Sequence, residues 1–239
     1  MEFKLRLFVF LDRFLPVCGR LKRFAYACWA ACTPRRRSYS QHGEDAVIAK
    51  ELQGWSPNDS IFVDVGANQP TRISNSYLLY RKGWHGITVE PNAELVKLHR
   101  LFRRRDVQVN VGCGREASLL QFYVSPISVL SSFSKKDGEY VSRLDYLPVL
   151  TVDQILTSFP DKKIALLSID TEGFDLEVLL GANETLKRTY LVCVEVNSPE
   201  EQSKIEALLA KDFEFCFAAG CNVLFRRRNG QSLKNEGND

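Results

Sequence analysis

Short apolar runs alternate with amphipathic segments along the chain from residue 39 onward. The apolar runs predict five buried strands, at residues 61–65, 87–90, 107–111, 164–169 and 191–196. Between the runs, apolar residues recur at helical spacing and predict helices at residues 45–52, 76–82, 93–102, 152–159, 177–180 and 200–211. Apolar strands separated by helices are typical of a parallel sheet with helices on both faces.

The C-terminal part of the chain has a different pattern. Residues 213–217 and 222–226 are strand-like runs joined by Ala-Ala-Gly-Cys, a short connection that predicts an antiparallel hairpin. Together with the five parallel strands, this hairpin predicts a seven-stranded, mostly parallel, Rossmann-like sheet with one reversed strand. Residues 119–124 predict an extra strand, and residues 132–148 are expected to form a loop at the rim of the sheet.

The first 37 residues differ from the rest of the chain in charge. The whole chain has 32 basic and 29 acidic residues and a net charge of +3. Nine basic and two acidic residues lie in residues 1–37, which gives that part +7 and the remainder −4. An acidic body disfavours a general nucleic-acid-binding protein, because such domains are usually basic throughout. We therefore divide the chain into a basic arm (1–38), an α/β domain (39–228) and a tail (229–239) that is expected to be disordered.

The arm is basic, aromatic and amphipathic. Its longest uncharged run, residues 24–34, has 11 residues, whereas a membrane-spanning helix needs about 20. No small-residue cleavage site follows a clean apolar core, which disfavours a secretory signal. The pattern fits peripheral contact with an anionic membrane. It fits equally well a helix packed on the body or on a second copy of the chain, so both interpretations stay open.

The cysteines indicate the compartment. There are seven, with no CxxC pair and no Cys/His cluster at zinc-site spacing. Cys193 and Cys216 lie in apolar runs, where a free thiol behaves as a small hydrophobic group. We expect free thiols in a reducing compartment, and hence a cytoplasmic protein that contacts a membrane at most peripherally.

The first two predicted strands end in residues that suit a ligand. In open α/β sheets, ligands bind beyond the carboxyl ends of the strands. The first strand ends in Asp64, Gly66 and Asn68, and a glycine permits close approach of the backbone. The second ends at Glu90, whose carboxylate can accept hydrogen bonds from two ribose hydroxyls. Its alternative role is a charge at the N-terminus of the next helix.

The other three strands also end in glycines or acids. Gly112 and Cys113 follow the third strand, where they leave room for an adenine ring or merely form a turn. Asp170 and Glu172 follow the fourth strand, and Glu195 ends the fifth. The alternatives are that Asp170 or Glu172 caps the next helix and that Glu195 pairs with an arginine.

The combination predicts a nucleoside cofactor without a pyrophosphate. Neither the G-x-G-x-x-G fingerprint of nicotinamide binding nor the G-x-x-x-x-G-K-[ST] phosphate loop is present. A glycine turn, an acid for the ribose and a rim rich in carboxylates fit S-adenosylmethionine, which carries a cationic sulfonium.

These residues resemble the FkbM family of S-adenosylmethionine-dependent methyltransferases, over about residues 39–226. Each motif alone is weak, but their order along one domain is specific. Gln69-Pro70 and Thr171 depart from the family's usual pattern. The motifs are Ser40-Gln-His-Gly-Glu-Asp45, Phe62-Val-Asp-Val-Gly-Ala-Asn68, Ser74-Asn-Ser-Tyr-Leu-Leu-Tyr80, Gly83-Trp-His-Gly86, Val89-Glu-Pro-Asn92, Leu130-Ser-Ser-Phe133 and Ser168-Ile-Asp-Thr-Glu-Gly173.

The resemblance implies a class I methyltransferase fold and methylation of a hydroxyl on a sugar, glycolipid or related small molecule. It implies that Asp64, Gly66, Asn68 and Glu90 hold the cofactor. It places Asp170 and Glu172 at the site, and the segment of His42 near the cofactor.

Methyl transfer to a hydroxyl benefits from a base beside the acceptor oxygen. His42 and Asp170 are the candidate bases; the alternative for the His42 segment is that Ser40 caps a helix. His99 is expected to be exposed on its helix. A Mg²⁺ ion is a further possibility, and its ligands would be Asp170, Glu172 and Glu195.

Three questions stay open from the sequence. The arginine runs 103–105 and 226–228 are expected to be solvated, with binding of an anionic acceptor as the alternative. The acceptor itself is not determined. The second functional hypothesis is a catalytically silent methyltransferase-like module that binds cofactor or a partner and uses the basic arm for membrane or oligomer contact.

Overall fold

The computed structural model describes residues 38–125, 131–134, 141 and 143–230, together with Leu21, Phe24, Ala25 and Cys28 of the arm. Most of the predictions for the arm and the tail therefore lie outside the described residues. At the start of the tail, the Gly230 N–H donates to the Arg227 carbonyl at 3.3 Å and closes a turn. None of the helices described is long and apolar enough to cross a membrane.

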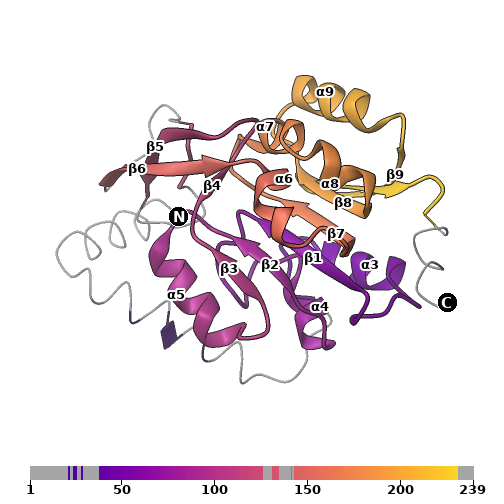
Figure 1. Cartoon of the computed structure of the whole chain (residues 1–239), viewed down its shortest axis with the longest axis horizontal. Helices are drawn as coiled ribbons and strands as arrows, with labels where there is room; N and C mark the ends of the chain where they lie inside the picture. Colours follow the sequence, from indigo (N-terminus) through magenta and orange to yellow (C-terminus); the bar gives the residue numbers. More distant parts are fainter. Residues whose placement is uncertain are drawn as a thin grey trace.

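A seven-stranded sheet forms the centre of the molecule (Figure 1). Its order is β3-β2-β1-β7-β8-β10-β9, and β10 runs antiparallel to both neighbours while the remaining pairs are parallel. This confirms the Rossmann-like class I methyltransferase fold with one reversed strand. The strands are β1 (Ser60–Val65), β2 (Gly86–Val89), β3 (Val107–Val109), β7 (Lys163–Ile169), β8 (Thr189–Glu195), β9 (Phe213–Ala219) and β10 (Asn222–Arg227).

Helices cover both faces of this sheet. On one face α3 and α4 pack against Phe62 and Leu166, and on the other α6, α7 and α9 pack against Val63 and Leu167. The central strands are mostly apolar because both of their faces are buried. The helices are α3 (Glu44–Glu51), α4 (Tyr77–Arg81), α5 (Ala93–Phe102), α6 (Val152–Ile155), the 3₁₀ turn η2 (Leu156–Ser158), α7 (Asp175–Leu180), α8 (Asn183–Lys187) and α9 (Pro199–Leu209).

Two helical features differ from the prediction. The helix expected at residues 152–159 is α6 followed by the tighter turn η2. The short helix α8 was not predicted, because its N-terminus is stabilised by a residue distant in sequence. The Asp153 carboxylate accepts the backbone N–H groups of Glu184 and Thr185 at 3.0 and 2.8 Å.

A second, three-stranded sheet stands beside the carboxyl edge of the first. It consists of β4 (Gly112–Cys113), β5 (Ser118–Val124) and β6 (Arg143–Leu150) in the order β4-β6-β5. The extra strand expected at 119–124 is confirmed as β5. The expectation that residues up to 148 form only a loop is wrong, because β6 pairs antiparallel with β5 along its whole length.

Candidate functional site

A cavity of about 260 Å³ lies where the carboxyl ends of β1, β2, β7 and β8 meet the second sheet. It brings together eight of the ten residues proposed from the sequence and leaves out Asp64 and His42. The eight are Gly66, Asn68, Glu90, Gly112, Cys113, Asp170, Glu172 and Glu195.

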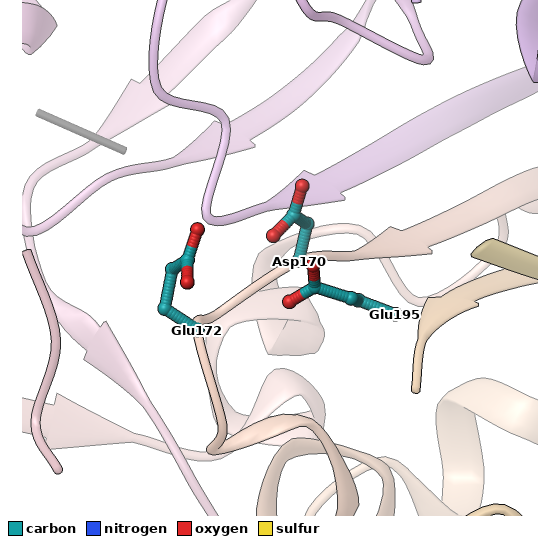
Figure 2. Close-up of side chains that lie close together, drawn as sticks. All are labelled: Asp170, Glu172 and Glu195. Carbon is teal, nitrogen blue, oxygen red and sulfur yellow. The ribbon is translucent and has the colours of Figure 1, made fainter. Parts of the chain in front are cut away.

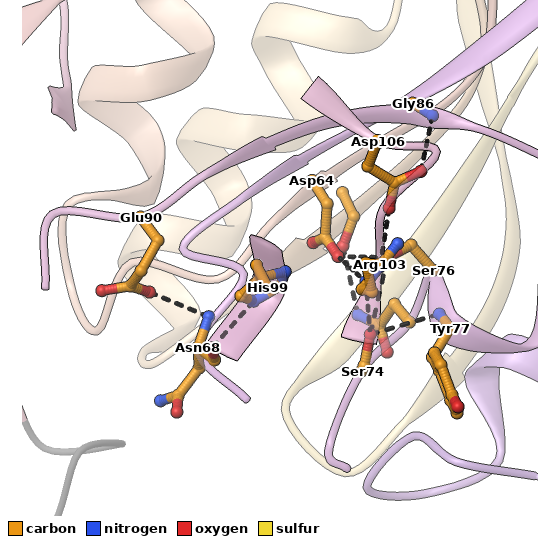
Figure 3. Close-up of polar contacts among 12 residues, drawn as sticks. Asp64, Asn68, Ser74, Ser76, Tyr77, Gly86, Glu90, His99, Arg103 and Asp106 are labelled. Atoms are coloured by element: carbon orange, nitrogen blue, oxygen red, sulfur yellow. Dashed lines mark hydrogen bonds and ion pairs between the residues drawn. The ribbon is translucent and has the colours of Figure 1, made fainter. Parts of the chain in front are cut away.

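Glu90 forms one wall of the cavity together with Asn68 (Figure 3). One Glu90 carboxylate oxygen accepts the Asn68 N–H at 2.8 Å, and the other accepts the Asn92 N–H at 2.7 Å. Two backbone donors occupy only part of what a carboxylate can accept, so further donors can still bind there. Burial raises the pKa of Glu90 to about 7 despite these bonds.

Asn68 is held from both sides in a left-handed conformation, with φ 41°. Opposite Glu90, the His99 ring nitrogen Nε2 lies 2.9 Å from the Asn68 carbonyl oxygen (Figure 3). A carbonyl only accepts, so His99 carries its proton on Nε2 in this bond. The cavity-lining peptide of Asn68 is thereby fixed by two buried side chains.

Gly66 brings the ends of two strands together. It has φ +75°, and a side-chain Cβ built at this position would lie 1.8 Å from the Asp170 carbonyl oxygen. Any other residue would therefore displace the backbone that carries Asp170. The glycine thus allows its backbone to lie close to the end of the neighbouring strand β7, at the edge of the cavity.

Gly112 and Cys113 form the short strand β4 at the other side of the cavity. A Cβ on Gly112 would lie 2.3 Å from the Phe133 ring, so the glycine lets that ring pack against the backbone. The Phe122 and Phe133 rings lie 4.9 Å apart and both line the cavity. This side of the site is therefore apolar and aromatic.

Three carboxylates face one another across the third side (Figure 2). Asp170, Glu172 and Glu195 each offer an oxygen within 4.8 Å of the other two. They meet because β7 and β8 are parallel neighbours, so their carboxyl ends lie at the same edge. Burial raises the pKa of Asp170 well above its usual value, and the nearby charges of Glu195, Asp175 and Glu172 raise it further.

The loop that carries Glu172 is held by its neighbours. Glu172 has φ 57° and Gly173 has φ 96°, so two successive residues are left-handed. The Ser132 hydroxyl donates to the Glu172 carbonyl at 2.9 Å. The Asp175 carboxylate accepts the N–H groups of Thr171 and Gly173 at 2.9 and 3.1 Å. Asp175, rather than Asp170 or Glu172, therefore satisfies the backbone before α7.

Asp64 points away from the cavity. It accepts the Ser76 hydroxyl and lies 3.9 Å from the Arg103 guanidinium, in a buried network (Figure 3). Arg103 also donates to the Asp106 carboxylate at 2.7 Å. Alternating residues of β1 face opposite sides of the sheet, and Asp64 shares the side of Phe62. The structure thus gives Asp64 structural contacts and no contact with the cavity.

His42 also lies outside the cavity. Its side chain is exposed and stands beside Gly220, where a Cβ would lie 2.3 Å from the ring. The acids of the same motif hold the chain here: Asp45 accepts the Tyr39 N–H at 2.6 Å, and Glu44 accepts the His42 N–H at 2.8 Å. The helix α3 begins at Glu44 rather than at Ser40, whose hydroxyl accepts the Gly43 N–H at 3.1 Å.

Two further expectations on exposure are wrong. His99 and Arg103 were expected at the surface, and both are fully buried. Burial and the Arg103 charge lower the pKa of His99 from 6.5 to about 3, so its ring is neutral at pH 7. The charge of Arg103 is tolerated because Asp64 and Asp106 compensate it.

Several cavity residues were missed from the sequence. All are uncharged, so no charge or glycine pattern identified them. Six of them lay within motifs that carry the family resemblance, which is the signal that could have found them: Gln41, Val65, Pro91, Ser131, Phe133 and Thr171. The missed residues are Gln41, Val65, Ile73, Pro91, Val111, Phe122, Ser131, Phe133 and Thr171.

A family model described as the methyltransferase FkbM domain matches residues 64–217, more than half of the chain. A crystal structure described as that of a "putative caffeoyl-CoA O-methyltransferase from Staphylococcus aureus" is similar at 10% identity with a TM-score of 0.48, covering 87% of this chain and 90% of that one. No curated protein matched the sequence.

Proposed function

Because the chain belongs to the FkbM methyltransferase family, we propose that it uses S-adenosylmethionine to methylate a hydroxyl oxygen of a sugar, glycolipid or related small molecule. The observation that carries the proposal is the cavity itself. One wall offers Glu90, a second an apolar aromatic surface, and a third the carboxylates of Asp170, Glu172 and Glu195. These are the surroundings that a ribose, an adenine and a sulfonium need.

The residues present fit this cofactor. Glu90 keeps acceptor capacity beyond its two backbone donors, and a ribose offers two adjacent hydroxyl donors. Phe133, packed on Gly112, provides a flat surface for the base. When bound, the cofactor supplies an activated methyl group as an electrophile. The chain's own task is then to place the acceptor oxygen in line and about 3 Å away.

Asp170 is the base that this proposal favours over His42. It lines the cavity, whereas His42 stands at Gly220. The raised pKa of Asp170 suits a group that takes up the acceptor's proton near neutral pH. After Asp170 has taken up the acceptor's proton, Glu172 and Glu195 still give this wall a negative potential. A well-placed base of this kind contributes about 10²- to 10⁴-fold in rate.

A Mg²⁺ ion at the same three carboxylates is the alternative that remains from the sequence. Oxygen ligands suit Mg²⁺, and the three side chains converge within 4.8 Å. We favour the carboxylates acting without a metal, because the same negative wall already suits the cationic sulfonium of the proposed cofactor. Methylation should then persist after dialysis against EDTA; its loss, with recovery on addition of Mg²⁺, would instead assign the acids to the ion.

The test combines binding with turnover. Calorimetry with S-adenosylhomocysteine should show binding to the wild type. Methyl transfer to a mixture of sugar and glycolipid acceptors should fall at least 100-fold in Asp170→Asn and clearly in Glu172→Gln. Glu184→Gln removes an exposed acid that pairs with Lys187 and is the matched control.

The outcomes separate the hypotheses. Absence of S-adenosylhomocysteine binding refutes the cofactor assignment. Binding without turnover on any acceptor supports the silent methyltransferase-like module. If Asp170→Asn leaves turnover unchanged, the methyltransferase activity stands and the assignment of Asp170 as the base is refuted.

A further inference from the structure

The outer face of α5 combines basic and apolar side chains. Lys97, Arg100 and Leu101 are exposed and lie three and four residues apart in α5. Helical residues at this spacing share one face. Arg104 is also exposed and lies just past the end of the helix at Phe102. Lys97 pairs with Glu94 at 2.9 Å. Arg100 and Arg104 have no acidic partner within the part of the chain that the structure describes. Within that part of the chain, their charges are therefore uncompensated.

The described residues of the arm extend this face with apolar side chains. Leu21, Phe24, Ala25 and Cys28 are helical and follow the spacing of a single helix face. The Phe24 ring lies beside α5, with its centroid 6.2 Å from that of Phe102.

These side chains leave much of their apolar surface uncovered. Leu21 remains 59% exposed and Phe24 43%, and Leu101 on α5 itself is 41% exposed. Exposed apolar residues gathered next to uncompensated charge indicate a binding surface.

The charge distribution selects the partner. The body outside the arm has a net charge of −4, so a basic face on α5 is a local exception within it. A second copy of the chain would bring the same positive face against itself, which repels. A nucleic acid would satisfy the arginines but would leave Leu21, Phe24 and Leu101 without an apolar partner. An anionic bilayer satisfies both, because it offers negative headgroups and an apolar interior.

We propose that α5 and the adjoining arm residues form a docking surface for an anionic lipid bilayer. Arg100 and Arg104 contact the headgroups, and Leu21, Phe24 and Leu101 enter the boundary of the acyl chains. Pro91, which precedes α5, lines the catalytic cavity, whereas Arg104 lies past the opposite end of the helix. Docking through the far end therefore leaves the cavity accessible to an acceptor.

Sedimentation of the full chain with vesicles tests this surface. We expect co-sedimentation with phosphatidylcholine vesicles that contain phosphatidylglycerol and not with phosphatidylcholine alone. Each basic residue near an anionic surface contributes about fivefold to binding. The double substitution Arg100→Glu, Arg104→Glu should therefore lower the partition coefficient about 30-fold or more. Lys50→Glu, Lys211→Glu changes the net charge equally at exposed positions elsewhere and is the matched control.

The apolar part is tested separately. Leu21→Ser, Leu101→Ser should weaken binding at moderate salt, where the electrostatic attraction is screened. The proposal would be overturned if the wild type bound neutral and anionic vesicles equally, or bound neither. It would also be overturned if the Arg100/Arg104 variant and the Lys50/Lys211 control lost vesicle binding to the same extent. A dimer in gel filtration that the Arg100/Arg104 variant dissociates would assign the face to a second copy instead.

Folding of the variants is checked independently of membranes. Each should bind S-adenosylhomocysteine as the wild type does, since none lies in the cavity. If the double variant does not fold, the single change Arg104→Gln lies outside the helix and should still lower vesicle binding about fivefold. Unchanged binding of that variant would count against the proposal.

Discussion

The buried His99 should make the stability of this protein depend on pH in a way that one substitution removes. The ring lies behind the cavity, fully buried, with Nε2 bonded to the Asn68 carbonyl at 2.9 Å. His99→Gln keeps a neutral N–H donor of similar size and removes the titrating group. The comparison therefore isolates the protonation of one side chain.

The magnitude follows from the lowered pKa. In the folded protein the pKa of His99 is about 3, against 6.5 when exposed. Between these values the unfolded chain binds the proton and the folded chain does not, so stability is lost as pH falls below 6.5. From pH 7 to pH 5 the loss should be about 2 kcal/mol. Buried carboxyls such as Glu90 titrate in both proteins and cancel in the difference.

Urea denaturation of both proteins, followed by tryptophan fluorescence at pH 7, 6 and 5, measures this difference. The wild type should lose about 2 kcal/mol relative to His99→Gln over that range. Two curves that stay parallel within about 0.5 kcal/mol would show that His99 is not a buried neutral ring and refute the reasoning. A third variant, His99→Leu, removes the donor as well. It should bind S-adenosylhomocysteine more weakly than His99→Gln does, because nothing then holds the Asn68 carbonyl.

Three further predictions test other parts of the structure. Arg103→Met should lower the free energy of unfolding by about 3–5 kcal/mol in urea, because Asp106 and Asp64 lose their buried counter-charge; a loss below about 1 kcal/mol would contradict the network. Glu90→Gln should weaken S-adenosylhomocysteine binding about tenfold or more by calorimetry. Because the pKa of Glu90 is about 7, affinity should rise through pH 7 in the wild type and stay flat in the variant. Ser132→Ala should lower the methylation rate and leave cofactor affinity unchanged, since its hydroxyl holds the Glu172 carbonyl; an equal effect on both would place Ser132 elsewhere.

The carboxylate wall could be predicted from the sequence because it depends only on strand direction. Asp170 and Glu195 each end or follow an apolar run, and parallel neighbouring strands must bring such residues to one edge. Glu90 follows the same rule at the end of β2. The helix α5 was predicted with the bounds observed, since its apolar residues repeat clearly and Asn92 caps it.

The side on which a residue of a central strand points could not be predicted. β1 is buried on both faces, so its sequence has no alternation that distinguishes them. Asp64 was therefore assigned to the cavity, whereas its side chain faces Arg103. The strand β6 was missed because its pairing with β5 is not local. The paired residues lie about 20–30 positions apart in the sequence.

The sequence by itself determined the seven strands of the main sheet and most of the helices, the carboxyl edge where the acids gather and the contrast between a basic arm and an acidic body. These features depend on local periodicity and on the composition of each segment. The tertiary structure alone decided that His99 and Arg103 are buried. Isolated histidine and arginine side chains favour water, and their burial is possible only where Asn68 and Asp64 meet them across the fold, with Asp106 adding a counter-charge three residues from Arg103. Such partners are set by packing between distant segments, which no local pattern records.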